Sequence, residues 1–114
     1  MDIEETGRFR HMLLSLREET EKALAAAVET TKPVELDQVV VGRISRIDAI
    51  QNQEMALATM RRREQLLEQI SQALQRIDAG TYGVCVRCGE DIDVRRLAFN
   101  PVVLMCVGCA ENRE

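Results

Sequence analysis

The stretch from residue 85 to residue 109, CVRCGEDIDVRRLAFNPVVLMCVGC, contains all four cysteines of the 114-residue chain. Cys85 and Cys88 form one C-x-x-C pair, and Cys106 and Cys109 form another after 17 intervening residues. Two such pairs at this separation let two short turns present four sulfur atoms tetrahedrally to one Zn2+. The spacing therefore predicts a small C-terminal zinc finger whose metal ligands are Cys85, Cys88, Cys106 and Cys109.

The predicted site leaves no ligand position for water, because the pattern holds four thiolates and neither histidine nor carboxylate. We therefore expect one structural zinc ion, which stabilises a segment too short to build a large core, rather than a catalytic one. Gly89, directly after the first pair, permits the positive φ that such a turn often needs. The same thiols leave a second interpretation open, a thiol switch that releases zinc when oxidised.

Composition limits both the size of the core and the class of partner. Aromatic residues make up 3% of the chain and charged residues 30%, so helices packed on narrow apolar stripes are favoured over a broad globular core. The net charge of -4 and the pI near 5.1 argue against binding to nucleic acid phosphates and favour protein partners. The N-terminus lacks a signal-peptide pattern and no run of about 18 apolar residues occurs, so we expect a cytoplasmic protein without a membrane segment.

Two long helices are predicted ahead of the cysteine segment. Apolar residues recur at helical spacing from about residue 3 to 30 and from about residue 37 to 79, where Gly80 is suited to end the helix. Pro33 interrupts the pattern, so residues 31–36 are predicted to form a turn, and this short connection makes the helices antiparallel. The predicted fold is mainly α: an antiparallel two-helix coiled-coil hairpin over residues 1–80, followed by the zinc finger over residues 81–114.

Apolar residues are densest at the end of the second helix, next to the cysteine segment. The Ala-rich stretch ALAAAV at residues 23–28, near the turn, allows close approach but adds little hydrophobic area. We therefore expect the end of the second helix to pack against the start of the first helix and against the zinc finger, through Leu66, Leu67, Ile70, Leu74 and Ile77.

No catalytic constellation is found in the sequence. His11 is the single histidine and has no clustered ligand, and neither a nucleophile with its base nor a phosphate-binding loop is present. The chain is therefore not predicted to be an enzyme.

The segment GTYGVCVRCGEDIDVRRLAFNPVVLMCVGC, residues 80–109, resembles the DksA/TraR family of bacterial transcription regulators. Besides the cysteines, the matching positions are Gly80, Tyr82, Gly83, Ile92, Arg96, Leu97 and Pro101. The resemblance implies a regulator that binds RNA polymerase directly rather than DNA, places its coiled-coil tip in the secondary channel and changes the stability of initiation complexes, in some members together with ppGpp. Longer members continue into a further C-terminal helix, so a shortened version is expected here.

The sequence at the expected tip departs from the family's D-x-x-D-x-A motif. In DQVVVG, residues 37–42, Asp37 matches the first acid, but Val40 and Gly42 stand where the second Asp and the Ala would be. Only Asp37 carries over as a tip residue. Arg43 and Arg46 are further candidates for contact with the partner, and the alternative for both is a solvated side chain without a role. Asp37 is also suited to a helix N-cap, so both roles stay open.

Two other functions are kept beside polymerase binding. One is a redox-responsive zinc-binding interaction protein, which uses the same four thiols. The other is a nucleic-acid-binding zinc finger. The second is disfavoured, because residues 81–114 contain four Arg and no Lys against five acidic residues, and therefore lack the basic surface that phosphates require.

Overall fold

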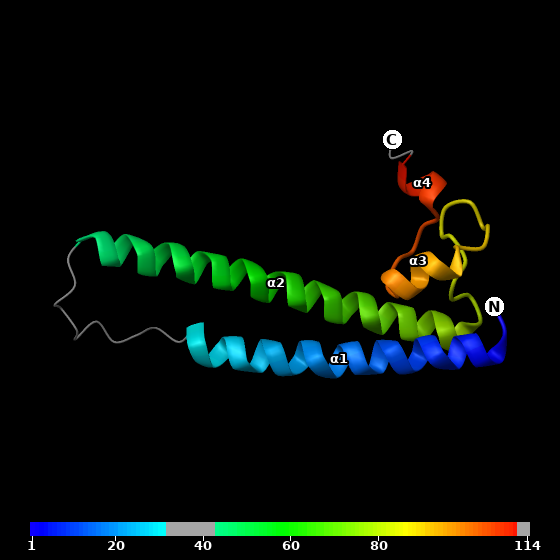
Figure 1. Cartoon of the computed structure of the whole chain (residues 1–114), viewed down its shortest axis with the longest axis horizontal. Helices are drawn as coiled ribbons and strands as arrows, with labels where there is room; N and C mark the ends of the chain where they lie inside the picture. The colour runs from blue at the N-terminus through cyan, green and yellow to red at the C-terminus, as the bar shows by residue number, and fades with distance from the viewer. Residues whose placement is uncertain (32–42, 112–114) are drawn as a thin grey trace. The chain divides into compact units, whose positions relative to one another are not determined.

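The computed structural model of the chain describes the backbone of residues 1–31 and 43–111 and the side chains of residues 1–28 and 49–111. Two long helices come first: α1 at Ile3–Thr31 and α2 at Arg43–Ala79 (Figure 1). The helices expected from the sequence spanned residues 3–30 and 37–79. The expected turn at residues 31–36 and the first residues of the expected second helix fall largely within residues 32–42, which lie outside the described residues.

The cysteine segment after α2 forms two short helices, α3 at Val94–Phe99 and α4 at Val107–Glu111. Within the described part of the chain, β-type pairing is limited to one isolated antiparallel bridge between Val84 and Asp91. The prediction of a mainly α fold with a C-terminal four-cysteine group is therefore confirmed.

By compactness the chain divides into two units. The first unit joins Met1–Glu18 to Glu68–Glu114, so it contains the start of α1, the end of α2 and the cysteine segment. The second unit, Glu19–Leu67, contains the rest of α1 and of α2. The domain boundary expected between residues 80 and 81 stays a prediction; by compactness, the end of α2 and the cysteine segment fall in the same unit.

The core of the first unit draws side chains from both long helices and from the cysteine segment. Its buried apolar residues are Phe9 and Leu13 from α1, Ile70, Ala73 and Ile77 from α2, and Tyr82, Cys85, Ile92, Leu97 and Val102 from the cysteine segment. Arg10 Nη2 of α1 pairs with Asp78 Oδ1 of α2 at 2.7 Å. The start of α1 therefore lies beside the end of α2, and the two helices run antiparallel in this unit. Ile70 and Ile77 are buried as the sequence predicted, whereas Leu66, Leu67 and Leu74 are partly exposed.

Local sequence signals set the two helix ends that belong to the first unit. Asp2 caps α1, because its Oδ1 accepts a 2.7 Å hydrogen bond from the Glu5 amide. At the other end, Gly80 has a φ of 77° and follows the last residue of α2. The amide of Thr81 donates to the Arg76 carbonyl at 2.9 Å and that of Gly80 to the Ile77 carbonyl at 3.1 Å, which is the Schellman pattern of helix termination. The chain therefore leaves α2 sharply and enters the cysteine segment.

The second unit is thinly packed by comparison. Among its residues whose side chains are described, only Thr20 is buried, with 6% of its surface exposed. The large apolar side chains of Ile50, Met55 and Leu57 are exposed. The low aromatic content and the Ala-rich stretch account for this, because small side chains bury little area between two helices. Across the described residues, no helix combines the length and the apolar character needed to cross a membrane.

Candidate metal centre

The four cysteine sulfur atoms lie within 4.8 Å of one another. Cys88 Sγ and Cys106 Sγ, one from each pair, are 3.7 Å apart, and all four cysteines are free of disulfides. Four sulfurs placed tetrahedrally at a Zn–S distance of about 2.3 Å are separated from one another by about 3.8 Å. The spacing of the sulfur atoms therefore suits one structural zinc ion, as the sequence predicted.

The first cysteine pair sits in a turn closed by backbone hydrogen bonds. The amide of Gly89 donates to the Cys85 carbonyl at 3.0 Å, and the amide of Cys85 donates to the Glu90 carbonyl at 2.8 Å. Gly89 has a φ of 77°, in the left-handed region that favours glycine, as expected for a turn of this kind. The bridge between Val84 and Asp91 pairs the two arms of the turn. We call residues 85–89 the first knuckle.

The second pair lies at the start of α4. Cys106 directly precedes the helix and Cys109 is within it, and the amide of Ala110 donates to the Cys106 carbonyl at 2.9 Å. The two pairs are connected through the backbone as well, because the Val86 amide donates to the Leu104 carbonyl at 2.9 Å. We call residues 106–110 the second knuckle. A one-turn helix and a glycine turn thus direct two sulfurs each toward a common point.

The local electrostatics favour a cation among the sulfurs. Backbone amides of Cys106 and Cys88 donate to the Cys85 sulfur and lower the pKa of this thiol to about 6. The neighbouring sulfurs of Cys106 and Cys88 instead raise the pKa of Cys109 to about 12. For Cys88 the Glu90 amide acts to lower the pKa, but burial and the sulfurs of Cys85 and Cys106 outweigh it, so that this pKa is raised. Four adjacent thiolates repel one another, and a bound divalent cation removes that repulsion.

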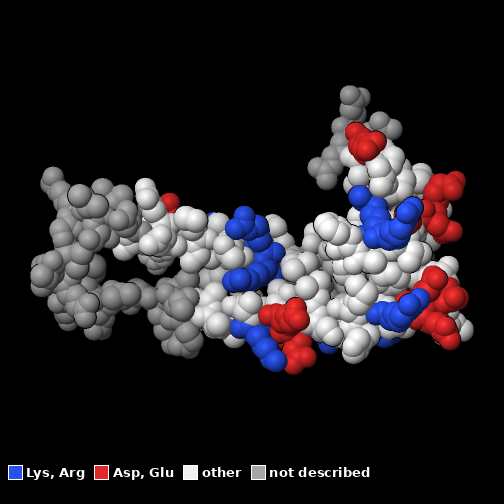
Figure 2. All heavy atoms as spheres, in the orientation of Figure 1, with Lys and Arg blue, Asp and Glu red and all other residues white. Residues whose placement is uncertain are grey.

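Arginine side chains near the cysteines contact oxygen atoms. Arg95 Nη2 pairs with Asp93 Oδ2 at 3.1 Å, and 92% of the Arg95 side chain is exposed. Arg96 Nε donates to the Met105 carbonyl at 3.0 Å. On the face drawn in Figure 2, the basic side chains of the cysteine segment lie beside acidic ones. The segment shows no continuous basic surface on that face, in keeping with its excess of acidic residues.

Tyr82 connects the cysteine segment to α1. Its hydroxyl donates to the Pro101 carbonyl at 2.7 Å, and its ring centroid lies 5.7 Å from that of Phe9, with the planes tilted by 52°. Burial raises the pKa of Tyr82 to about 12. Tyr82 and Pro101 are both among the positions that carry the family resemblance, and here they hold the segment around the cysteines together and against α1.

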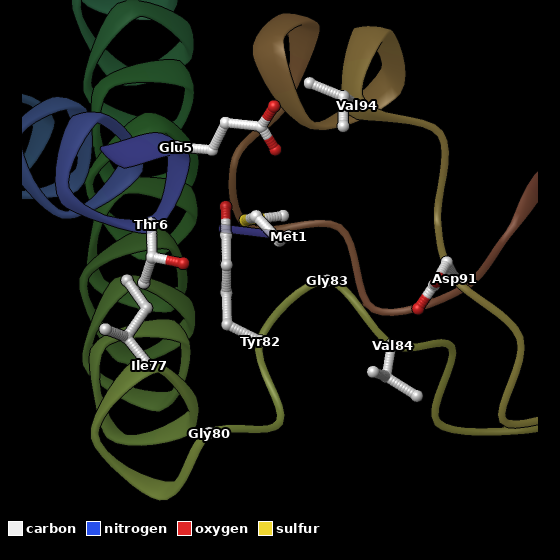
Figure 3. A pocket seen from close by; sticks show the side chains of 10 residues that line it. All are labelled: Met1, Glu5, Thr6, Ile77, Gly80, Tyr82, Gly83, Val84, Asp91 and Val94. Carbon is white, nitrogen blue, oxygen red and sulfur yellow. The ribbon is translucent and has the colours of Figure 1, made fainter. Parts of the chain in front are cut away.

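A cavity of about 290 Å³ lies beside Tyr82 in the first unit (Figure 3). Met1 covers Gly83 there: a Cβ added to Gly83 would come within 2.7 Å of Met1 Cε, and Gly83 also has a φ of 83°. None of the cysteines lines this cavity, so it is separate from the metal centre. Its lining residues are Met1, Glu5, Thr6, Ile77, Gly80, Tyr82, Gly83, Val84, Asp91 and Val94.

The side chains of the residues expected at the tip lie outside the described part of the chain. Asp37 lies outside the described residues. Arg43 and Arg46 belong to the first turn of α2, but their side chains are also outside the described part. Their assignment to a partner-binding tip stays a prediction. Sequence reasoning missed the part played by Arg76, whose side chain donates to the carbonyls of Thr81 and Val84 just ahead of the first knuckle, because nothing in an arginine at a helix end signals its partner.

Comparison with known proteins identifies similar chains. Residues 80–114 match the prokaryotic dksA/traR C4-type zinc finger family. The RNA polymerase-binding transcription factor DksA of Caulobacter vibrioides is 38% identical over 60 residues, which cover 53% of this chain and 42% of that protein. General stress protein 16O of Bacillus subtilis is 30% identical over 106 residues, covering 91% of this chain and 65% of that protein.

A solved structure shares the fold along nearly the whole chain. The structure of transcription factor DksA2 from Pseudomonas aeruginosa superposes with a TM-score of 0.82 and 26% identity, over 97% of this chain and 84% of that one. The chain spans less than half the length of several of the curated relatives that it matches, including the Caulobacter protein and an Aquifex aeolicus protein of which it covers 33%.

Proposed function

We propose that this chain, which belongs to the DksA/TraR family, binds RNA polymerase and regulates the initiation of transcription. The observation that carries the proposal is the joint match of the cysteine segment to the family's zinc finger and of 97% of the chain to the DksA2 fold. Several relatives are named as RNA polymerase-binding transcription factors. The protein acts by binding rather than by catalysis, in the cytoplasm where the polymerase is found.

We propose that Cys85, Cys88, Cys106 and Cys109 are the ligands of the zinc ion. The support is the clustering of their sulfurs within 4.8 Å and the C4 type of the matching family. Bound zinc neutralises thiolate charge and joins the two knuckles, so it stabilises a segment with few buried residues of its own. The zinc finger holds the first unit together, because Tyr82 and Cys85 belong to the same core as Phe9 and Ile70.

We propose that the partner-contacting tip lies around Asp37, with Arg43 and Arg46 beside it, and that it enters the secondary channel of the polymerase. The support is the resemblance to the family's tip motif at Asp37 alone. Because Val40 and Gly42 replace the second acid and the alanine, the charge presented by this tip differs from the family pattern. A carboxylate acts on Mg2+ and basic residues through charge, which valine lacks. We therefore expect binding to be retained while the regulatory effect differs.

A pull-down with purified core RNA polymerase tests the proposal. The wild-type chain is compared with a variant whose residues 33–42 are replaced by a neutral turn, and with Cys106→Ser. The wild type should be retained by the polymerase. In a transcription assay and a zinc determination run alongside, the turn variant should lose the effect on transcription while keeping its zinc. Cys106→Ser should lose zinc and polymerase binding together. If the wild-type, zinc-loaded chain is not retained, polymerase binding is excluded.

Two further measurements test ppGpp dependence and binding to free DNA. Addition of ppGpp to the transcription assay shows whether this chain acts together with the alarmone, as some family members do. An electrophoretic mobility assay at low salt, with free DNA and no polymerase, tests the zinc finger as a nucleic acid binder. We expect no retardation, because the cysteine segment has more acidic than basic residues.

A further inference from the structure

Two arginines contact the backbone at equivalent places, directly before each of the two knuckles. Arg76, near the end of α2, donates from Nη2 to the Val84 carbonyl at 2.5 Å, and Arg96 of α3 donates from Nε to the Met105 carbonyl at 3.0 Å. Val84 directly precedes Cys85, and Met105 directly precedes Cys106. Each arginine therefore holds the peptide group that leads into the first cysteine of a knuckle.

The peptide between Val84 and Cys85 is held at both of its polar ends. Arg76 binds its carbonyl, and its amide, which is that of Cys85, donates to the Glu90 carbonyl at 2.8 Å. The same Arg76 guanidinium also donates to the Thr81 carbonyl at 3.0 Å. Because a peptide group is planar, hydrogen bonds to both ends fix its orientation. The direction in which the Cys85 side chain leaves the backbone is fixed with it.

The peptide between Met105 and Cys106 is held in the same way, but its amide points to a sulfur. Arg96 binds its carbonyl, and the Cys106 amide donates to the Cys85 sulfur in the other knuckle. A donor at the carbonyl polarises the peptide and strengthens the hydrogen bond that its amide makes. Arg96 thus acts on a hydrogen bond that joins the two knuckles.

We propose that Arg76 and Arg96 are positioning residues of the zinc centre, which orient the two knuckles so that the sulfurs are arranged before the metal binds. The inference rests on the zinc ligands proposed above. Groups that orient metal ligands from the second layer typically change metal affinity about 10-fold to 100-fold when removed. Each arginine should therefore contribute an effect of that size to zinc affinity.

Long-range attraction between the arginine charges and the thiolates would also raise zinc affinity. The neighbouring Arg95 distinguishes this explanation from a positioning role. Arg95 has the same charge and is adjacent to Arg96 in the sequence, but its side chain is 92% exposed and pairs with Asp93. Its side chain binds the Asp93 carboxylate, not a carbonyl that leads into a knuckle. Arg76 and Arg96, in contrast, are only partly exposed. If Arg76 and Arg96 position the knuckles, removal of the Arg95 side chain should leave zinc affinity unchanged. If net charge is the cause, removal of any of the three arginines should lower zinc affinity equally.

Competition with a zinc chelator of known affinity tests the proposal on the full-length chain. Arg76→Met and Arg96→Met remove the donors but keep most of the side-chain volume, and Arg95→Met is the matched control. We expect each of the first two variants to bind Zn2+ about 10-fold to 100-fold more weakly and Arg95→Met to bind as the wild type does. The Co2+ complex of every variant should retain the absorption of a four-thiolate site.

Two more variants separate the loss of the arginine donor from the loss of charge and from a general loss of stability in the first unit. Arg96→Lys keeps the charge but not the guanidinium Nε donor, and it should weaken zinc binding nearly as much as Arg96→Met. Arg10→Met removes an ion pair with Asp78 elsewhere in the same unit and should leave zinc affinity unchanged. Wild-type affinity in both Arg76→Met and Arg96→Met, or an equal loss in Arg95→Met, overturns the positioning role. A wild-type chain that binds neither Zn2+ nor Co2+ overturns the metal site itself.

Discussion

Tyr82 gives a direct measurement of packing at the residue scale, because the chain has one tyrosine and no tryptophan. Burial raises its pKa from the ordinary 10.0 to about 12. We expect the ultraviolet absorbance of the phenolate to develop around pH 12 in the folded chain and around pH 10 in the denatured chain. A folded chain whose tyrosine titrates at its ordinary pH would show that this ring is exposed to water.

The same shift fixes the sign of the pH effect on stability. The folded state holds the Tyr82 proton more tightly than the unfolded state, so the contribution of the buried hydroxyl is fully present below about pH 10. It decreases as the pH rises from there to about 12. Tyr82→Phe serves as the control: it removes this part of the alkaline dependence and leaves the Pro101 carbonyl without its donor.

Zinc binding should release protons, since the metal takes thiolates. At pH 7 the Cys85 thiol, with a pKa of about 6, is mostly ionised, whereas Cys109, with a pKa of about 12, and Cys88, whose pKa is also raised, hold their protons. We expect at least two protons to leave per zinc ion bound, and the apparent zinc affinity to increase with pH. Calorimetric titration in two buffers of different ionisation enthalpy measures this number.

A second addition of zinc to the saturated protein is the control for this titration and should release no protons. Release of fewer than two protons per zinc would mean that Cys88 or Cys109 is already ionised or does not bind the metal.

Residue types and spacing predicted that the four cysteine sulfurs cluster, because zinc coordination imposes both the residue type and the spacing. The contacts of Arg76 and Arg96 could not be predicted in the same way. They depend on which carbonyl comes within reach of a long side chain once α2 and α3 are packed. Arg95 and Arg96 are identical in type and adjacent in sequence, yet one pairs with Asp93 and the other with the Met105 carbonyl.

At the scale of elements, two of the isoleucines on α2 lie in opposite environments. Ile70 is fully buried in the first unit, and Ile50 is 57% exposed in the second. Truncation of a buried isoleucine to alanine costs about 2–5 kcal/mol, because apolar area is lost and a cavity remains. We expect Ile70→Ala to lower the free energy of unfolding by that amount, measured by urea denaturation of the zinc-loaded chain.

Ile50→Ala is the matched control, since it makes the same substitution on the same helix. An exposed substitution typically changes stability by less than about 0.5 kcal/mol. Equal effects of the two substitutions would contradict the burial pattern and the location of the core.

The long helices follow from periodicity, whereas the short ones do not. A stripe repeated over 29 or 37 residues gives an unambiguous pattern. α3 has 6 residues and α4 has 5, less than two turns each, so no stripe can be recognised. α3 is instead specified by a cap, in which Asp93 Oδ1 accepts a 2.8 Å hydrogen bond from the Arg95 amide. α4 follows Cys106 directly and includes Cys109.

At the scale of the whole molecule, the stability and the proposed regulatory chemistry belong to different parts of the sequence. Among the side chains that the structure describes, all the buried ones except that of Thr20 belong to the first unit, which also contains the cysteines, while Asp37 falls within the range of the second. Composition predicted a thin core, because a chain with 3% aromatic residues cannot fill a broad one, and the apolar residues at the end of the second helix predicted where it lies. A substitution near Asp37 should therefore leave the fold of the first unit unchanged.

Asp37→Ala is the variant that tests this separation. It removes one negative charge where the family resemblance places the acid that acts within the polymerase, so it should change the effect on transcription without changing zinc content, helicity or retention by the polymerase. Asp78→Ala is the control: it makes the same chemical change on α2 but breaks only an exposed ion pair with Arg10, which contributes at most about 1 kcal/mol. In a single-round transcription assay, Asp78→Ala should match the wild type. An Asp37→Ala protein that also matches the wild type would reduce Asp37 to a helix cap and move the tip elsewhere.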